Sequence, residues 1–117
     1  MTTTRKMTPR EVGLVEALLA DHLDNAFSRE HLEALDVEEM DDGGMGSLKF
    51  LSSRSARMAQ QLSEVTFHDN DGVWVSATLN LDPEGLLFEL DIFKGDFSPL
   101  IEIPDRLALA RPRAGSE

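Results

Sequence analysis

Residues 64–93, with the sequence EVTFHDNDGVWVSATLNLDPEGLLFELDIF, decide the fold. Apolar and polar side chains alternate with a period of two through most of this stretch. Two tetrapeptides rich in turn-forming residues, Asp-Asn-Asp-Gly at 69–72 and Asp-Pro-Glu-Gly at 82–85, interrupt the alternation. Strand-period segments joined by short turns are typical of an antiparallel meander. The stretch therefore predicts three strands, at residues 65–68, 73–81 and 86–93.

The alternation also divides the side chains of the predicted sheet between two faces. Antiparallel sheets commonly bury one face and leave the other in water, so we expect a helix to cover the more apolar face. That face carries Val73, Val75, Ala77, Leu79 and Leu81. The opposite face carries Trp74, Leu87 and Phe93 among polar residues that include Asp91. These large apolar side chains predict either a binding patch with an acidic rim or a surface covered by residues 99–104 or by the second helix.

The N-terminal part of the chain has the signals of two helices. Thr8 suits an N-cap, and Glu11 is placed to close a capping box with it. Behind them, apolar residues recur every three or four positions and predict an amphipathic helix over residues 9–23. The stripe consists of Leu14, Val15, Leu18, Leu19 and Leu23. Ser28 is expected to cap a second, shorter helix that extends to Leu35.

A glycine-rich segment separates two short apolar runs in the middle of the chain. Residues 35–40 and 47–51 flank the segment Asp-Asp-Gly-Gly-Met-Gly at 41–46, and this arrangement predicts a hairpin. Three glycines within four residues imply positive φ angles or a close approach of the backbone. The following polar stretch is expected to be a loop, with a helical turn over residues 56–62.

Together these elements predict an α+β fold. We expect the N-terminal helices to pack on one face of a mainly antiparallel sheet of about five strands, formed by a hairpin and a three-stranded meander. The length of 117 residues indicates a single domain, which we place at residues 8–104 with flexible termini at 1–7 and 105–117. Within it, prolines at 99 and 104 bracket an apolar segment that is expected to be an edge piece or a flap over the core.

Composition excludes several classes of function. The chain has 11 basic and 22 acidic residues and a net charge of −11, so nucleic-acid phosphates and anionic membrane surfaces are unfavourable partners. No apolar run approaches the roughly 20 residues of a membrane span, and the N-terminus lacks the apolar region of a signal peptide. The chain contains no cysteine, which excludes disulfides and thiolate sites and fits a reducing compartment. We therefore expect a soluble cytoplasmic protein.

Two stretches resemble a family of small bacterial proteins of unknown function. They are EMDDGGMGSLKF at residues 39–50 and FELDIFKGDFSPLI at residues 88–101. The family pairs an acidic Asp-Gly-Gly-Met-Gly-Ser segment with an Asp-Phe-Ser-Pro-Leu-Ile segment, and the resemblance extends over roughly residues 8–104. The resemblance implies that the two segments act together, and it adds no catalytic residue.

Motifs for specific chemistry are weak or incomplete. The segment at 41–46 lacks the following helix of a phosphate-binding loop, and its two aspartates would repel a phosphate. Carboxylates gather near Asp41, Asp42, Asp91 and Asp96, and oxygen-rich clusters suit Mg²⁺ or Ca²⁺, but the spacing of an EF-hand is absent. The three histidines are too scattered for a zinc motif. We therefore expect no cofactor and assign no metal ligand.

Three hypotheses about function follow. The first is a non-catalytic, acidic protein-binding module, of the kind that immunity proteins and inhibitors represent. It would bind a basic protein through Trp74, Leu87 and Phe93 or through the acidic corner that ends in Asp41 and Asp42. The alternative is a small metal-dependent or acid–base enzyme, which requires the clustered carboxylates to converge in a pocket. The third is self-association through an exposed sheet edge, and we expect a monomer or a weak homodimer.

Overall fold

A computed structural model describes residues 4–20 and 28–109 of the chain. Within these residues, helices and strands occur in the order β1 (Thr4–Lys6), α1 (Pro9–Leu19), α2 (Arg29–Ala34), β2 (Asp36–Glu39), β3 (Leu48–Phe50), β4 (Gln60–His68), β5 (Trp74–Leu81), β6 (Leu87–Lys94) and α3 (Arg106–Leu109). The α+β class is confirmed, and no helix of the described residues is long and apolar enough to cross a membrane.

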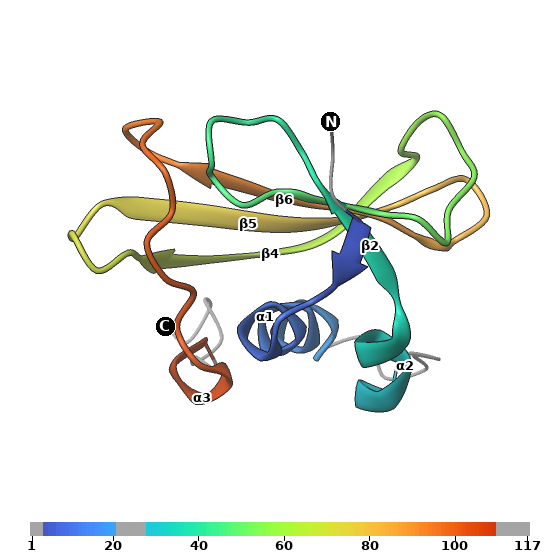
Figure 1. Cartoon of the computed structure of the whole chain (residues 1–117), viewed down its shortest axis with the longest axis horizontal. Helices are drawn as coiled ribbons and strands as arrows, with labels where there is room; N and C mark the ends of the chain where they lie inside the picture. The colour runs from blue at the N-terminus through green and yellow to red at the C-terminus, as the bar shows by residue number, and fades with distance from the viewer. Residues whose placement is uncertain (1–3, 21–27, 110–117) are drawn as a thin grey trace.

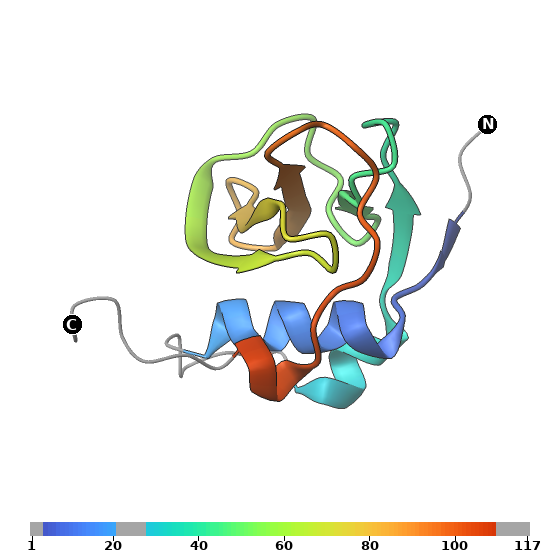
Figure 2. The same ribbon diagram turned by 90° about the vertical axis from the view of Figure 1, so that its left-hand side faces the viewer.

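The described strands form one antiparallel sheet of six strands in the order β1-β2-β3-β6-β5-β4. The hairpin of β2 and β3 and the meander of β4, β5 and β6 are confirmed, and β3 pairs with β6 to join them. Figure 1 shows the helices gathered on one side of this strongly twisted sheet, and Figure 2 shows α1 running beneath it. The molecule is therefore a two-layer arrangement of helices on a sheet.

The core lies between α1 and the face of the sheet that the alternation marks as apolar. Leu14 and Leu18 of α1 belong to the same buried cluster as Val75, Ala77 and Leu79 of β5, and each of these side chains is at most 2% exposed. Thr8 and Glu11 form the predicted capping box at the start of α1. Period-two and helical patterns thus located the core correctly, because both patterns reflect which side chains leave water.

A β-bulge in β6 overturns one prediction about the sheet faces. The register between β5 and β6 shifts after the pair Asn80–Glu89, and the next pair is Leu81–Leu87, so Phe88 is an extra residue. An extra residue reverses the alternation on one side of the bulge. Leu87 consequently points into the core with 1% exposure, and its predicted place on the open face is wrong.

The ends of the domain and the start of the meander also differ from expectation. Residues 4–6, expected to be flexible, form β1, which pairs with β2 and raises the strand count from five to six. Residues 60–62, assigned to a helical turn, begin β4.

Beyond the predicted boundary at 104, α3 forms and buries Leu109 to 3% exposure. Short segments of this kind fold because tertiary contacts stabilise them, and the local sequence carries little signal for them. The predicted end of the first helix, residues 21–23, lies outside the described residues.

The C-terminal segment connects the sheet to the helix layer. In Figure 1 it descends from the end of β6 past the ends of β5 and β4 to α3. Ile103 is buried in the core, and the partly buried side chain of Leu100 packs against the core. The segment therefore acts as a flap over one end of the core, which leaves the outer face of β4, β5 and β6 open.

Candidate functional site

Three aromatic side chains form a cluster at one end of the open face. Trp74 begins β5, Phe93 lies near the end of β6, and Phe97 follows in the turn after β6. The ring centroids of Trp74 and Phe93 lie 6.2 Å apart and those of Phe93 and Phe97 5.1 Å apart, both edge to face. Trp74 is 43% exposed and Phe97 69% exposed. This set, called the aromatic cluster below, presents large apolar rings to solvent.

Phe97 holds an unusual backbone conformation. Its φ angle is 66°, and no other non-glycine residue in the described ranges has a positive φ. For a bulky L-residue this conformation costs about 1–2 kcal/mol. Its N–H donates to Lys94 O at 2.9 Å, and the carboxylate of Asp96 accepts from the hydroxyl and N–H of Ser98 at 2.6 and 3.0 Å. The turn thus keeps a phenyl ring exposed where glycine or asparagine would cost less, a kind of strain that clusters at functional sites.

Carboxylates lie on the same face as the aromatic cluster. The register places Glu64 beside Thr78, Thr78 beside Asp91, and Asn80 beside Glu89, so all three carboxylates share the open face. Burial and the negative charge of Asp91 raise the pKa of Glu89, against the opposing effect of Lys49. Hydrogen bonds from Ser98, led by its hydroxyl, lower the pKa of Asp96 in the turn that carries Phe97. The open face therefore combines an apolar end with an acidic middle.

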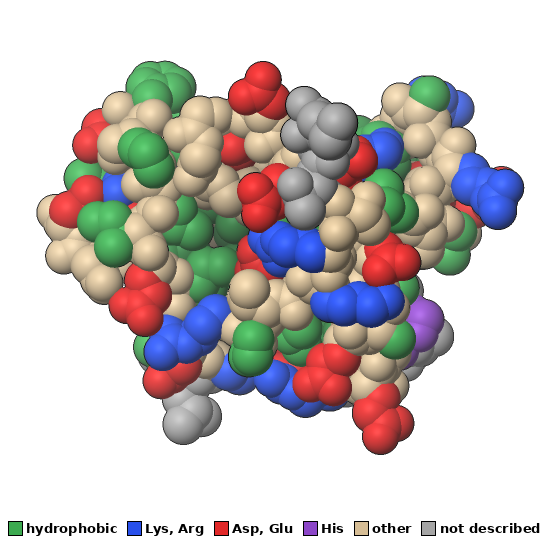
Figure 3. All heavy atoms as spheres, in the orientation of Figure 1, with side chains coloured by type: hydrophobic (Ala, Val, Ile, Leu, Met, Phe, Trp, Pro, Cys, Tyr) green, Lys and Arg blue, Asp and Glu red, His purple; other side chains and the backbone are tan. Residues whose placement is uncertain are grey.

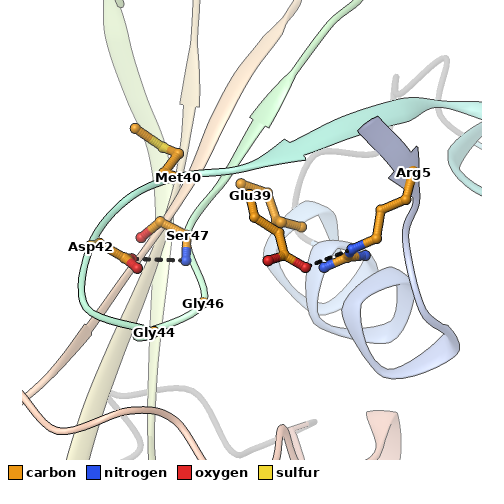
Figure 4. A pocket seen from close by; sticks show the side chains of 8 residues that line it. Arg5, Glu39, Met40, Asp42, Gly44, Gly46 and Ser47 are labelled. Atoms are coloured by element: carbon orange, nitrogen blue, oxygen red, sulfur yellow. Dashed lines mark hydrogen bonds and ion pairs between the residues drawn. The ribbon is translucent and has the colours of Figure 1, made fainter. Parts of the chain in front are cut away.

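The loop between β2 and β3 is organised by Asp42. Its carboxylate accepts hydrogen bonds from the N–H groups of Met45 and Ser47 at 3.1 and 3.0 Å, and Figure 4 shows it turned toward Ser47. Gly43, Gly44 and Gly46 have φ angles of 77°, 84° and 104°, which satisfies the expectation from the glycine spacing. Both carboxylate oxygens of Asp42 therefore stabilise the conformation of the loop through hydrogen bonds.

This loop packs directly on the segment that follows β6. Leu100 N–H donates to Gly44 O at 3.0 Å, and Lys94 N–H lies 3.3 Å from Met45 Sδ as a donor. The Ser47 hydroxyl accepts from Ile92 N–H at 2.8 Å and lies 3.2 Å from Ile92 O, so it extends the β3–β6 ladder by one step. The two stretches that carry the family resemblance are therefore neighbours in space.

A shallow pocket lies beside the loop and has a volume of about 190 Å³. Its lining comes from β1, β2, the loop and β3, and consists of Arg5, Glu39, Met40, Asp42, Gly44, Gly46, Ser47 and Leu48. Arg5 is already paired with Glu39 at 3.0 Å, as Figure 4 shows, and with Glu11 at 2.8 Å. The pocket is smaller than the roughly 300–1,000 Å³ of typical ligand sites. The charged side chains that line the pocket, Arg5, Glu39 and Asp42, already form ion pairs or hydrogen bonds within the fold.

A buried ion pair connects the end of β6 to the turn between β4 and β5. Lys94 is fully buried, and its ammonium donates to Asp69 at 2.8 Å, Asp71 at 2.7 Å and Pro99 O at 3.1 Å, which uses all three donors. Burial opposes ionisation of Asp69, but hydrogen bonds from Lys94 and from the N–H groups of residues 101, 70 and 102 outweigh it and lower the pKa of Asp69 to about 2. The ion pair ties the β4–β5 turn to the flap.

The predicted site residues fall into two groups. Trp74 and Phe93 meet on the open face as expected, and Asp91 is exposed beside them, whereas Leu87 is in the core. Asp41 is exposed, while Asp42 and Asp96 each hold a local turn. Figure 3 shows acidic and basic side chains interspersed over the helix side, with hydrophobic side chains gathered where the turn after β6 lies.

Phe97 and Lys94 are not among the site residues predicted from the sequence. The period-two pattern of Leu90 and Ile92 places Lys94 on the buried face, and this was the available signal for it. Nothing in the sequence marks the positive φ of Phe97, because phenylalanine rarely adopts that conformation. Across residues 4–20 and 28–109, no group of three histidine, aspartate or glutamate side chains is arranged to hold a metal ion.

Comparison with known proteins identifies a family but no individual relative. Neither the curated proteins nor the solved structures contain a match to this chain. A family model described as a domain of unknown function, DUF6984, matches residues 4–104, which include all the described strands, the loop between β2 and β3 and the turn that carries Phe97. The chain therefore belongs to the DUF6984 family of domains of unknown function.

Proposed function

We propose that this protein is a non-catalytic binding module that engages a basic protein through the open face of its sheet. The observation that carries the proposal is Phe97, which is 69% exposed, packed on Phe93 and held at a φ of 66°. A fold gains no stability from exposing a phenyl ring on a strained backbone. A partner that buries the ring would account for both features.

The chemistry of the face indicates what such a partner carries. Aromatic anchors surrounded by polar groups are typical of the energetic centre of protein interfaces. Aromatic rings also attract arginine and lysine side chains, and the neighbouring Glu64, Glu89 and Asp91 supply negative charge. A net charge of −11 accelerates encounter with a positively charged protein. These properties suit a cytoplasmic inhibitor or adaptor of the immunity-protein kind.

Substitution of Phe97 by asparagine tests the proposal. Phe97→Asn keeps a residue that tolerates positive φ and removes the ring, so the folded state should be as stable as the wild type or more stable. Affinity capture from the host lysate with tagged wild type should retain a basic protein in stoichiometric amount. Phe97→Asn and Trp74→Ala should each reduce the captured amount at least tenfold.

Leu86→Ala is the matched control, because Leu86 is 39% exposed and lies in the turn at the opposite end of β6. It should capture the same protein as the wild type. Equal capture by Phe97→Asn and the wild type would mean that the aromatic cluster does not bind the partner.

A further inference from the structure

The two edges of the described sheet differ in how well they are protected from pairing. β1 is an edge of three residues, and it carries Arg5 and Lys6, both of which form ion pairs. Short, cationic edge strands resist pairing with another chain. β4 is an edge of nine residues without proline, lysine or arginine. In Figure 2, β4 lies at the left margin of the sheet, with no described element outside it.

The main-chain groups of β4 alternate between the neighbouring strand and the free edge. The N–H of Asp69 donates to Val73 O, so residues 69 and 73 form a hydrogen-bonded pair of the β4–β5 ladder. The N–H of Gly95 donates to Trp74 O, so the main chain of Trp74 bonds toward β6 and not toward β4. It follows that Val65 and Phe67 bond to β5, whereas the main-chain groups of Glu64, Thr66 and His68 point away from it. Among the described residues, no hydrogen bond reaches these outward groups.

The free edge is complementary to itself in one register. We propose that β4 of one chain pairs with β4 of a second copy, antiparallel, about a two-fold axis at Thr66. In this register Thr66 lies opposite Thr66 of the second copy, and the pairs Glu64–His68 and Val65–Phe67 each occur twice. The outward main-chain groups of residues 64, 66 and 68 in each copy then form hydrogen bonds with those of the other copy. A register centred on Glu64 would place two carboxylates opposite each other, which is unfavourable.

The structure leaves these side chains available for such pairing. Glu64, Thr66 and His68 are exposed, and they lie on the open face. One carboxylate oxygen of Glu64 accepts from the Ser76 hydroxyl, so the other is available to the histidine of the second copy. The bulge between Gln61 and Ser63 leaves residues 63–68 as a regular strand.

The dimer would be a continuous sheet of twelve described strands, and both aromatic clusters would lie on the same side of it, because the two-fold axis is perpendicular to the sheet. Edge pairing of about five residues gives a small interface, so we expect a dissociation constant between about 10 μM and 1 mM. The inference does not depend on the proposed protein partner.

Sedimentation equilibrium of the full chain up to about 1 mM tests the pairing. The wild type should show a monomer–dimer equilibrium. Thr66→Pro removes an outward N–H that the described monomer does not use, and it should weaken dimerisation at least tenfold. Thr66→Val, which keeps the main-chain groups, should change it less than threefold. A wild type that remains monomeric at 1 mM overturns the proposal.

A charge-exchange experiment tests the register independently of the proline variant. Glu64→Lys places lysine opposite histidine, and His68→Glu places glutamate opposite glutamate, so each variant alone should be monomeric. Mixed in equal amounts, they place lysine opposite glutamate and histidine opposite glutamate, and they should form a heterodimer. If the mixture stays monomeric while the wild type dimerises, or if both variants dimerise as the wild type does, β4 is not the interface.

Discussion

At the scale of single residues, Lys94 shows how a charged side chain is accommodated on the buried face of a sheet. Its three hydrogen bonds join the β4–β5 turn, through Asp69 and Asp71, to the flap, through Pro99. Lys94→Met leaves the carboxylate of Asp69 buried without its cation, which is strongly destabilising. We expect the melting temperature to fall by more than about 10 °C, measured by circular dichroism. Lys49→Met, on the open face, should change it by only a few degrees.

Asp69 gives the fold a specific dependence on pH. Its pKa is lowered to about 2 from the ordinary value of 3.8. A lowered pKa means that the ionised carboxylate stabilises the fold above about pH 4, and that this stability is lost as the pH falls through about 2. Asp69→Asn should therefore melt at a lower temperature than the wild type at pH 7. The difference should shrink between about pH 5 and pH 2, and a constant difference would contradict this role.

At the scale of elements, the packing of the β2–β3 loop on the segment after β6 can be measured with two glycines. Gly43 and Gly44 have similar positive φ angles, so alanine at either position costs about 1–2 kcal/mol in backbone strain. A Cβ at Gly44 would lie 3.2 Å from Pro99 Cβ, whereas a Cβ at Gly43 would meet nothing within 4 Å. In urea unfolding, Gly44→Ala should lose about 1 kcal/mol more than Gly43→Ala. Equal losses would mean that the contact does not constrain the loop.

The same elements show how far the sequence predicts the structure. Alternation located the core face of β5 and brought Trp74 and Phe93 together on the open face, because each period-two step changes sides in a regular strand. It failed at Leu87, because the bulge at Phe88 depends on pairing with another strand. It carries no signal for Phe97, which lies beyond the alternating stretch and whose conformation is set by contacts with Lys94 and by the neighbouring turn.

At the scale of the whole molecule, the sheet has one face that stabilises the fold and one face that is open to solvent. The helices and the flap cover the first, and the aromatic cluster and the carboxylates of β4 and β6 occupy the second. The strained backbone of Phe97 lowers the stability of the fold, whereas its exposed ring is the feature that the proposed binding function requires.

The most direct test of this division is isothermal titration of the captured protein with the wild type and with Phe97→Asn, alongside the free energy of unfolding of both. We predict that Phe97→Asn raises the dissociation constant at least tenfold, about 1.4 kcal/mol, while the free energy of unfolding stays the same or increases. An unchanged dissociation constant, with the variant folded, would contradict the claim that the aromatic cluster binds the partner.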